Sequence, residues 1–197
     1  EVFVCGHQTA GRGQIGNKWV SEGHRNLTFS AILTPKFLSA QHQFQLNIVV
    51  ALALADTINY FSPHSENKIK WPNDMLVNTK KIAGILIENQ ILGSYLSNSV
   101  IGIGLNLNQQ NFEGLNATSL AIETATSLNL NTVLAFLLER LEIHYLALKR
   151  GNVEVQKELY LNNLYGFKQS LLFEDSTGKF EGVITGIDAI GRLIVIK

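Results

Sequence analysis

The residues best suited to chemistry gather in four short segments of this 197-residue chain. Residues 11–16 form a glycine loop that contains one arginine, and residues 70–74 read Lys-Trp-Pro-Asn-Asp. Residues 80–86 begin with two lysines, and residues 102–108 alternate glycine with apolar residues before ending in asparagine. Guanidinium, ammonium, amide and backbone N–H groups hold phosphates and stabilise developing negative charge. Together these segments favour phosphoryl or nucleotidyl transfer.

The glycine loop at residues 11–16 has several readings. It matches the dinucleotide fingerprint G-x-G-x-x-G, but residues 31–36 offer no acidic partner and the following segment leads into a strand. It has the glycine spacing of a P-loop, but Asn17 replaces the lysine and Trp19 replaces the serine or threonine. An anion-binding loop in which Arg12 adds a bidentate donor, and an ordinary surface turn, both remain open.

The lysine segments also leave two readings. A hairpin that links Lys70 to the Lys80-Lys81 pair would let Lys70 and Lys81 face one ligand, whereas a solvated hairpin tip is the usual place for paired lysines. Gly84 within a strand rich in isoleucine indicates that another group approaches the backbone closely. Asn106 suits contact with a phosphate or a hydrated metal, or alternatively a tight crossing of the sheet.

The composition of the chain and the motifs that it lacks exclude further classes of protein function. A 46% hydrophobic content indicates a large core, and 16 basic against 16 acidic residues give no electrostatic footprint for nucleic acid. The apolar stretches are shorter than the roughly 20 residues that cross a bilayer, so no membrane partner is expected. One cysteine and the lack of a leader pattern favour the cytoplasm. Five scattered histidines, with no H-E-x-x-H, C-x-x-C or G-x-S-x-G motif, argue against a nucleophile supplied by the protein.

The periodicity of apolar residues predicts the elements that carry these segments. Residues 27–33 alternate as a half-buried strand does, and residues 41–61 and 134–148 show helical spacing. We expect strands at 1–5, 27–33, 68–71, 82–88 and 100–107, and helices at 41–61, from Asn131 or Thr132 to Lys149, and at 153–165. From residue 167 onward, turns at 175–178 and 188–191 separate short strands.

These elements predict an α/β (α+β) protein with a mixed β-sheet flanked by helices. Residues 1–165 form the main domain, and residues 166–197 form a small β domain. About thirty residues of β-meander cannot hold a core alone, so this part must pack on the main domain or close into a small barrel that continues beyond Lys197.

Four motifs in order, at residues 8–19, 70–74, 81–86 and 102–106, resemble those of the biotin protein ligase (holocarboxylase synthetase) family. The resemblance implies a class II synthetase-like fold. Residues 1–165 would be the biotin- and ATP-binding catalytic domain, whose N-terminal part is expected to be missing, and residues 166–197 part of an SH3-like β-barrel. A member without a DNA-binding domain is expected, because no helix-turn-helix precedes the core.

The resemblance implies a biotin–[biotin carboxyl carrier protein] ligase that uses ATP, biotin and Mg²⁺. Biotin is activated as biotinyl-5′-AMP and then transferred to a lysine of the biotin carboxyl carrier protein of acetyl-CoA carboxylase or of a related biotin enzyme. Pairing through sheet edges in related enzymes allows a homodimer. The alternatives are a lipoate or octanoate ligase or transferase of the same fold, and a non-catalytic biotin or adenylate sensor.

The resemblance also implies roles for individual residues. Arg12 and Lys81 would lie around the biotin carboxylate and the α-phosphate. Asn106 would in addition serve Mg²⁺. The implied catalytic residues are Lys81, Arg12, Lys70 and Asp74; those that bind biotin are Gln8, Gly11, Arg12, Gly13, Trp19, Lys81, Gly84 and Leu86; those that bind the nucleotide are Arg12, Gln14, Trp71, Asn73 and Asn106.

Two departures from the family pattern matter. Many members carry arginine where this chain has Gln14 and Asn17, so the loop has less positive charge with which to retain an adenylate. The family's Ser-Thr-Asn motif, which lies upstream of the glycine loop, is absent from the sequence. The reduced charge at Gln14 and Asn17 predicts easier leakage of the intermediate. The missing motif would compromise biotin binding if this sequence is the whole protein.

Overall fold

A six-stranded antiparallel sheet forms the centre of the computed structural model, which describes residues 1–14 and 18–197. Gly16 of the glycine loop and the following Asn17 lie outside the described residues. The strands, in their order across the sheet, are β1 (Val2–Val4), β4 (Leu27–Leu33), β8 (Tyr95–Leu105), β7 (Lys80–Leu92), β6 (Asp74–Val77) and β5 (Asn67–Lys70). The sheet was expected to be mixed, but its named strands pair antiparallel, and parallel pairing occurs in isolated bridges such as that between Ile69 and Leu164.

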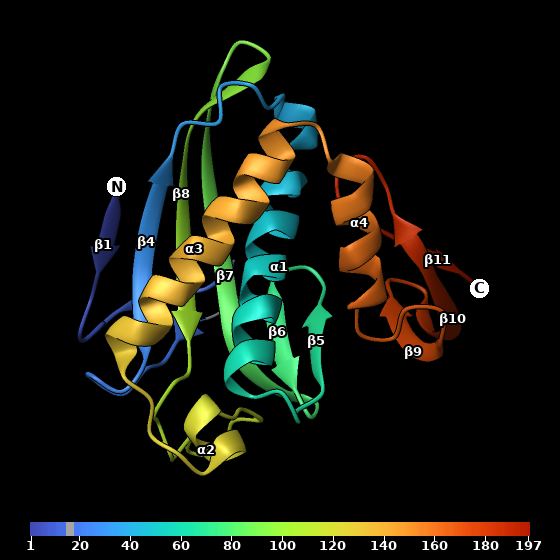
Figure 1. Ribbon diagram of the computed structural model, residues 1–197. Coiled ribbons are helices and arrows are strands. Elements are labelled where there is room, and N and C mark those ends of the chain that lie inside the picture. Colours follow the sequence, from blue (N-terminus) through green and yellow to red (C-terminus); the bar gives the residue numbers. More distant parts are fainter. Residues whose placement is uncertain (15–17) are drawn as a thin grey trace.

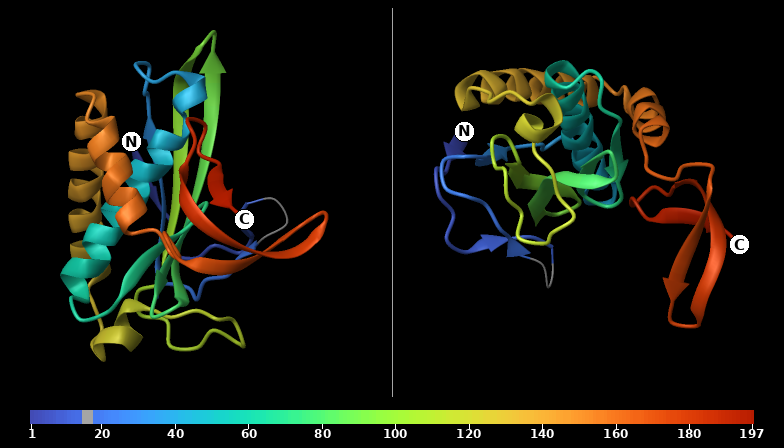
Figure 2. Two further views of the ribbon diagram at one scale, coloured as in Figure 1. Left: turned by 90° about the vertical axis from the view of Figure 1, so that its right-hand side faces the viewer. Right: turned by 90° about the horizontal axis from the view of Figure 1, so that it is seen from below.

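Helices cover one face of this sheet, as Figure 1 shows. Helix α1 (Phe44–Phe61) packs on β5, β6 and β7, and α3 (Leu130–Lys149) packs on α1. The other helical elements are η1 (Ala40–His42), α2 (Leu120–Thr124) and α4 (Val153–Asn162). The small hairpin of β2 (Gly11–Arg12) and β3 (Lys18–Trp19) lies on the opposite face, as the two views of Figure 2 show.

Successive side chains of the central strands point alternately to the two faces of the sheet. Phe29, Ile85 and Ile103 are buried with the helices in one continuous core. The neighbouring positions point to the other face, and apart from Leu86 they carry small or polar residues, among them Thr28 on β4 and Gly104 on β8. The helix-covered face therefore provides stability, and the open face is available for a ligand.

Helix α1 is the central helix of the core. Residues Ala40–Phe61 are long and apolar enough to cross a membrane by length and composition, with a mean hydropathy of 1.3. The uninterrupted apolar stretches within it are shorter, as expected from the sequence, but the average over the helix tolerates interspersed polar residues such as Asn47 and Thr57. The window is 61% buried inside the protein, as expected of a helix enclosed between a sheet and other helices.

The chain between Lys70 and Lys81 differs from the prediction. A single hairpin was expected, but β6 intervenes, so that β5, β6 and β7 form two successive hairpins. The sequence of β6 is only four residues long, and its Met75, Leu76 and Val77 are buried. A short run of this kind carries too little periodicity to be separated from the neighbouring turns.

Two helix boundaries also differ. Helix α3 begins at Leu130 because the Asn129 side chain accepts a hydrogen bond from the Thr132 N–H, 3.1 Å away, and caps the helix. Helix α4 ends at Asn162 rather than near Tyr165. The following residues leave the helix to pair with the edge strand β5, where the Ile69 N–H donates to the Asn163 carbonyl and the Tyr165 N–H donates to the Ile69 carbonyl.

The last 28 residues contain a three-stranded antiparallel sheet of β9 (Ser170–Asp175), β10 (Gly178–Ile187) and β11 (Leu193–Ile196). Phe173 and Phe180 stack across the β9–β10 pair with ring centroids 5.7 Å apart. Ile184 and Ile187 of β10 are buried in the core shared with the main sheet. This small sheet therefore packs on the rest of the molecule, beyond α4 in Figure 1.

Candidate active site

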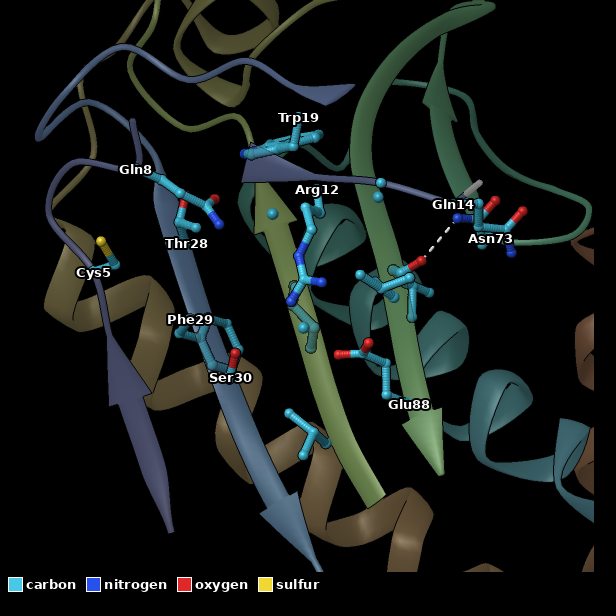
Figure 3. A pocket seen from close by; sticks show the side chains of 18 of the residues that line it. Cys5, Gln8, Arg12, Gln14, Trp19, Thr28, Phe29, Ser30, Asn73 and Glu88 are labelled. Atoms are coloured by element: carbon cyan, nitrogen blue, oxygen red, sulfur yellow. Dashed lines mark hydrogen bonds between the residues drawn. The ribbon is translucent and has the colours of Figure 1, made fainter. Parts of the chain in front are cut away.

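A cavity of about 330 Å³ opens on the face of the main sheet that the helices leave free. Its floor consists of two rows of cross-strand neighbours on β4, β8 and β7 (Figure 3). The first row is Thr28, Gly104 and Gly84, and the second is Ser30, Gly102 and Leu86. Glycine at the centre of both rows removes the side chains that would otherwise fill the space, so the backbone itself forms the floor.

The Trp19 ring covers the first row. A Cβ atom on Gly104 would lie 2.4 Å from Trp19 Cε2, and one on Gly84 would lie 3.5 Å from Trp19 Cζ3. The β2–β3 hairpin holds this tryptophan, because Gly11 pairs with it and a Cβ on Gly11 would lie 2.2 Å from the Trp19 carbonyl oxygen. Gly104 and Gly11 are therefore required for the close packing of the tryptophan, whereas a Cβ on Gly84 would make only an ordinary contact with its ring. Its Nε1 atom is buried and has no hydrogen-bond partner among the described residues.

Charged side chains of both signs line the cavity. Arg12 extends over the floor in Figure 3, and Lys18, Lys81, Asp74 and Glu88 also line the cavity. Lys81 and Asp74 form an ion pair, with Nζ 2.6 Å from Oδ1 and side chains that are 39% and 23% exposed. This pair uses one of the three donors of the lysine ammonium and leaves the others available for an anionic ligand.

A β-bulge directs Lys81 into the cavity. Strict alternation from Gly84, which faces the cavity, would place Lys81 on the helix-covered face. In the β6–β7 pair, however, Met75 lies opposite Ala83 and Leu76 lies opposite Lys81, so Ile82 is an extra residue. Ile82 is fully buried, and its carbonyl accepts from the Asn106 N–H at 2.8 Å. One inserted residue thus moves the lysine to the face that carries the cavity.

The turn between β5 and β6 brings two more polar groups to the site. The Asn73 side chain lines the cavity, and its Nδ2 donates to the Ile85 carbonyl at 2.8 Å (Figure 3). The carbonyl of Pro72, which follows a cis peptide bond, accepts from Asn47 Nδ2 on α1 at 3.0 Å. Asp74 is the first residue of β6. The turn is therefore tied both to β7 and to α1.

Asn106 directly follows the last residue of β8 and is buried outside the cavity lining. Its Nδ2 donates to the Thr118 carbonyl at 3.0 Å, and its Oδ1 is buried without a hydrogen-bond partner among the described residues. The Thr118 N–H donates to the Lys81 carbonyl, and the Lys81 N–H donates to the Asn116 carbonyl. Asn106 thus supports the loop that anchors the Lys81 backbone.

The structure brings together most of the residues singled out from the sequence, and leaves four outside. Lys70 is exposed and pairs with Asp74 across the hairpin without lining the cavity. Gly11, Trp71 and Asn106 also lie outside the lining. The predicted residues that line the cavity are Gln8, Arg12, Gly13, Gln14, Trp19, Asn73, Asp74, Lys81, Gly84 and Leu86.

Several lining residues escaped the sequence analysis, notably Lys18, Thr28, Ser30, Glu88 and Val100. For the residues other than Lys18, which lies on β3, the alternation along β4, β7 and β8 was the available signal. Once Leu27 and Phe29 are assigned to the core, the residues between and after them must face the other side. Lys18 lies inside the motif at residues 8–19 but received no role, and no motif marks the other four positions.

The arrangement suits binding and charge stabilisation. An apolar surface of tryptophan ring and glycine backbone lies beside Arg12 and Lys81, so a ligand with an apolar body and a carboxylate could place each part against a matching surface. No histidine is found among the described residues that line the cavity. The site can therefore hold an anion and stabilise added negative charge during displacement at phosphorus.

Comparisons with known proteins point to one family. Residues 1–106 match the model of the biotin/lipoate A/B protein ligase family. The chain is 31% identical over 199 residues to the bifunctional ligase/repressor BirA of Bacillus spizizenii, covering 98% of this chain and 61% of the relative. It is 29% identical to the biotin–[acetyl-CoA-carboxylase] ligase of Mycobacterium tuberculosis, covering 98% of this chain and 71% of that protein.

A solved structure shows the same architecture over the whole chain. The biotin protein ligase from Aquifex aeolicus in complex with biotin and ATP superposes with a TM-score of 0.84 and 26% identity, covering 100% of this chain and 82% of that one. The chain thus spans about three fifths of the length of the Bacillus relative and most of the Aquifex structure.

Proposed function

This chain belongs to the biotin/lipoate A/B protein ligase family, and on that basis we propose that it activates biotin with ATP and transfers the biotinyl group to a carrier protein. The observation that carries the proposal is the convergence of Arg12 and the Lys81–Asp74 pair beside the glycine floor under Trp19. The choice of substrate is supported by relatives described as biotin ligases and by the solved structure of a biotin protein ligase in complex with biotin and ATP.

In the first step, a biotin carboxylate oxygen attacks the α-phosphorus of ATP. The bond from that phosphorus to the bridging oxygen breaks, and pyrophosphate leaves with the electron pair. Arg12 and Lys81 stabilise the negative charge that accumulates around the α-phosphorus, and Gln8 and Trp19 bind the body of biotin. Asp74 keeps the Lys81 ammonium at the cavity, 2.6 Å from its own carboxylate.

In the second step, a lysine amine of the biotin carboxyl carrier protein attacks the acyl carbon of biotinyl-5′-AMP. The bond from that carbon to the phosphate oxygen breaks, AMP leaves, and the nitrogen releases a proton as the amide forms. Neither step uses a nucleophile from the enzyme, which agrees with the donor-rich composition of the cavity.

We propose that Mg²⁺ binds together with ATP. The described residues contain no cluster of three or more His, Cys, Asp or Glu side chains. Mg²⁺ is commonly held by substrate phosphates, waters and one or two carboxylates, and Asp74 is the carboxylate nearest to Lys81. The Mg²⁺ role that the resemblance implies for Asn106 fits less well, since that side chain lies outside the cavity lining.

We further propose that residues 1–165 form the catalytic domain and residues 166–197 a separate small β domain, with the cytoplasm as the site of action. The formal net charge of zero gives no support for a nucleic-acid partner. A homodimer formed through an exposed sheet edge remains part of the proposal.

The test is biotin-dependent exchange of pyrophosphate into ATP, run beside lipoate and octanoate. Exchange with biotin alone would establish adenylate formation by this chain. Exchange with lipoate or octanoate instead would transfer the proposal to that acid. A folded protein that exchanges with none of the three would overturn the ligase function and favour a sensor.

A further inference from the structure

Trp71 belongs to the Lys-Trp-Pro-Asn-Asp segment, yet its side chain contacts the C-terminal sheet instead of the cavity. Its Nε1–H donates to the Gly191 carbonyl at 2.7 Å, across 120 residues of sequence. Asn73 and Asp74, two and three residues further on, do line the cavity. The hydrogen bond therefore links the C-terminal sheet to a turn of the candidate active site.

The Gly191 carbonyl is held in place by the turn between β10 and β11. Asp188 Oδ1 accepts from the backbone N–H groups of Ile190 and Arg192 at 3.0 and 2.9 Å, and Arg192 Nε donates to Asp188 Oδ2 at 2.7 Å. These hydrogen bonds from Arg192 lower the pKa of the Asp188 carboxyl. The carboxylate form that organises the turn is thus favoured at neutral pH.

Gly191 also fits tightly against the main domain. Its φ of +89° lies in the left-handed region, and a Cβ atom at this position would lie 2.1 Å from Phe44 Cγ at the start of α1. The turn therefore contacts two elements of the main domain at once, the first residue of α1 and Trp71. This double contact fixes its carbonyl relative to the β5–β6 turn.

From Trp71 a short series of contacts reaches the reacting groups. The Asn73 amide donates to the Ile85 carbonyl on β7, and the Ile85 N–H donates to the Asn73 carbonyl at 2.9 Å. Asp74 then holds Lys81 through the 2.6 Å ion pair. A shift of Trp71 would move the β5–β6 turn and with it Asp74. Because Asp74 holds the Lys81 ammonium, the ammonium would move as well.

We propose that Trp71 and the turn Asp188–Arg192 are positioning elements, through which docking of the C-terminal sheet sets the placement of Asp74 and Lys81. Trp71 is thereby a positioning residue and not a nucleotide-binding one. The expected effect on the rate of catalysis rests on the proposed ligase function, whereas the expected change in the placement of Lys81 does not.

The test compares Trp71→Phe and Asp188→Ala with the wild-type chain. Trp71→Phe keeps an aromatic ring and removes the N–H donor, and Asp188→Ala releases the turn. The matched control is Asp175→Ala, which removes a comparable turn carboxylate at the other end of β10, where Asp175 accepts from Thr177. The three variants and the wild-type chain are first compared by circular dichroism and thermal melting.

The first measurement is the rate at which an amine-reactive reagent modifies Lys81, with the exposed neighbour Lys80 as internal reference by peptide mass spectrometry. Loss of one positioning hydrogen bond corresponds to about a three- to tenfold effect. We expect Trp71→Phe and Asp188→Ala to increase the Lys81 rate by about that factor, with Lys80 unchanged and Asp175→Ala equal to wild type.

The second measurement is biotin-dependent pyrophosphate exchange. Both variants should lower kcat by a similar factor while the KM for biotin stays close to wild type, because Trp19 and the glycine floor are not altered. Unchanged Lys81 modification in both variants would overturn the proposal, as would an equal effect of Asp175→Ala. If wild-type chain shows no exchange, the ligase function fails, and the modification rates still decide this inference.

Discussion

The side chains of Lys81 on β7 and Asp74 on β6 meet in an ion pair with Nζ 2.6 Å from Oδ1, although the strand register places Gly84 opposite Asp74 and a β-bulge has turned the lysine toward the cavity. The pair is half-buried, so solvent weakens its contribution to stability. In the proposed mechanism the role of the pair is positional, because the carboxylate holds the ammonium where a substrate carboxylate and phosphate would meet.

Lys81→Ala should abolish most biotin-dependent exchange while the protein stays folded. Removing one preorganised donor to a developing negative charge lowers kcat by about 10²–10³-fold in comparable sites. Lys80→Ala is the matched control, because Lys80 is exposed and does not line the cavity. Equal activity of the two variants would remove Lys81 from the proposed mechanism.

Gly104→Ala should weaken biotin binding by displacing Trp19. The new Cβ would lie 2.4 Å from Trp19 Cε2 and 2.5 Å from Cζ2, so the ring must move away from the floor. We expect the KM for biotin to rise by about tenfold or more, a loss that corresponds to about 1.4 kcal/mol. Gly186→Ala is the control, since its Cβ would make an ordinary 3.8 Å contact with Ile194. A Gly104→Ala protein with the wild-type KM would show that the tryptophan does not shape the biotin site.

Gln14→Arg should slow the release of biotinyl-5′-AMP. Gln14 is exposed at the cavity, where an arginine would add a charge-assisted hydrogen bond to the adenylate phosphate. Such a bond corresponds to about tenfold slower release, measured as free adenylate formed from biotin and ATP without an acceptor protein. Gln41→Arg adds the same charge on an exposed residue away from the cavity. Comparable release from both variants would count against the leakage predicted from the loop sequence.

Tyr160→Phe should leave the stability unchanged or raise it. Tyr160 is fully buried, its ring packs edge-to-face with Phe44, and its hydroxyl has no hydrogen-bond partner among the described residues. An unsatisfied buried hydroxyl costs about 1–3 kcal/mol, so its removal should increase the free energy of unfolding by up to about 1 kcal/mol. Denaturant titration measures this, with Tyr60→Phe as the exposed control. A clear loss of stability would reveal a partner for the hydroxyl.

Acid titration should report on the turn between β9 and β10. Hydrogen bonds from the Thr177 hydroxyl and N–H, with Lys197 adding a further donor, lower the pKa of Asp175 from 3.8 to about 2. A lowered pKa means that the stabilisation is present above pH 3.8 and is lost as the pH falls through about 2. NMR titration of the Asp175 carboxyl should give the low value in the wild-type chain. Thr177→Ala should bring the pKa back toward 3.8, and an unchanged value would exclude the hydroxyl as its cause.

Local sequence patterns determined much of this protein. The alternation of Leu27, Phe29 and Ala31 predicted β4, and glycines two residues apart, at 102 and 104, had to share one face of their strand. Helical spacing located α1 and α3, and the turns with aspartate and glycine located the C-terminal strands. The resemblance added the candidate chemistry, and most of its residues meet in one cavity.

The tertiary structure decided which of these residues face one another. The inserted Ile82 reverses the face of Lys81, Lys70 lies outside the cavity lining, and Trp71 points to Gly191 at the far end of the chain. Periodicity reports which residues of one element share a face, because that depends on neighbours in the sequence. Bulges, strand partners and domain contacts depend on pairing between distant segments, and no local pattern encodes the register of that pairing.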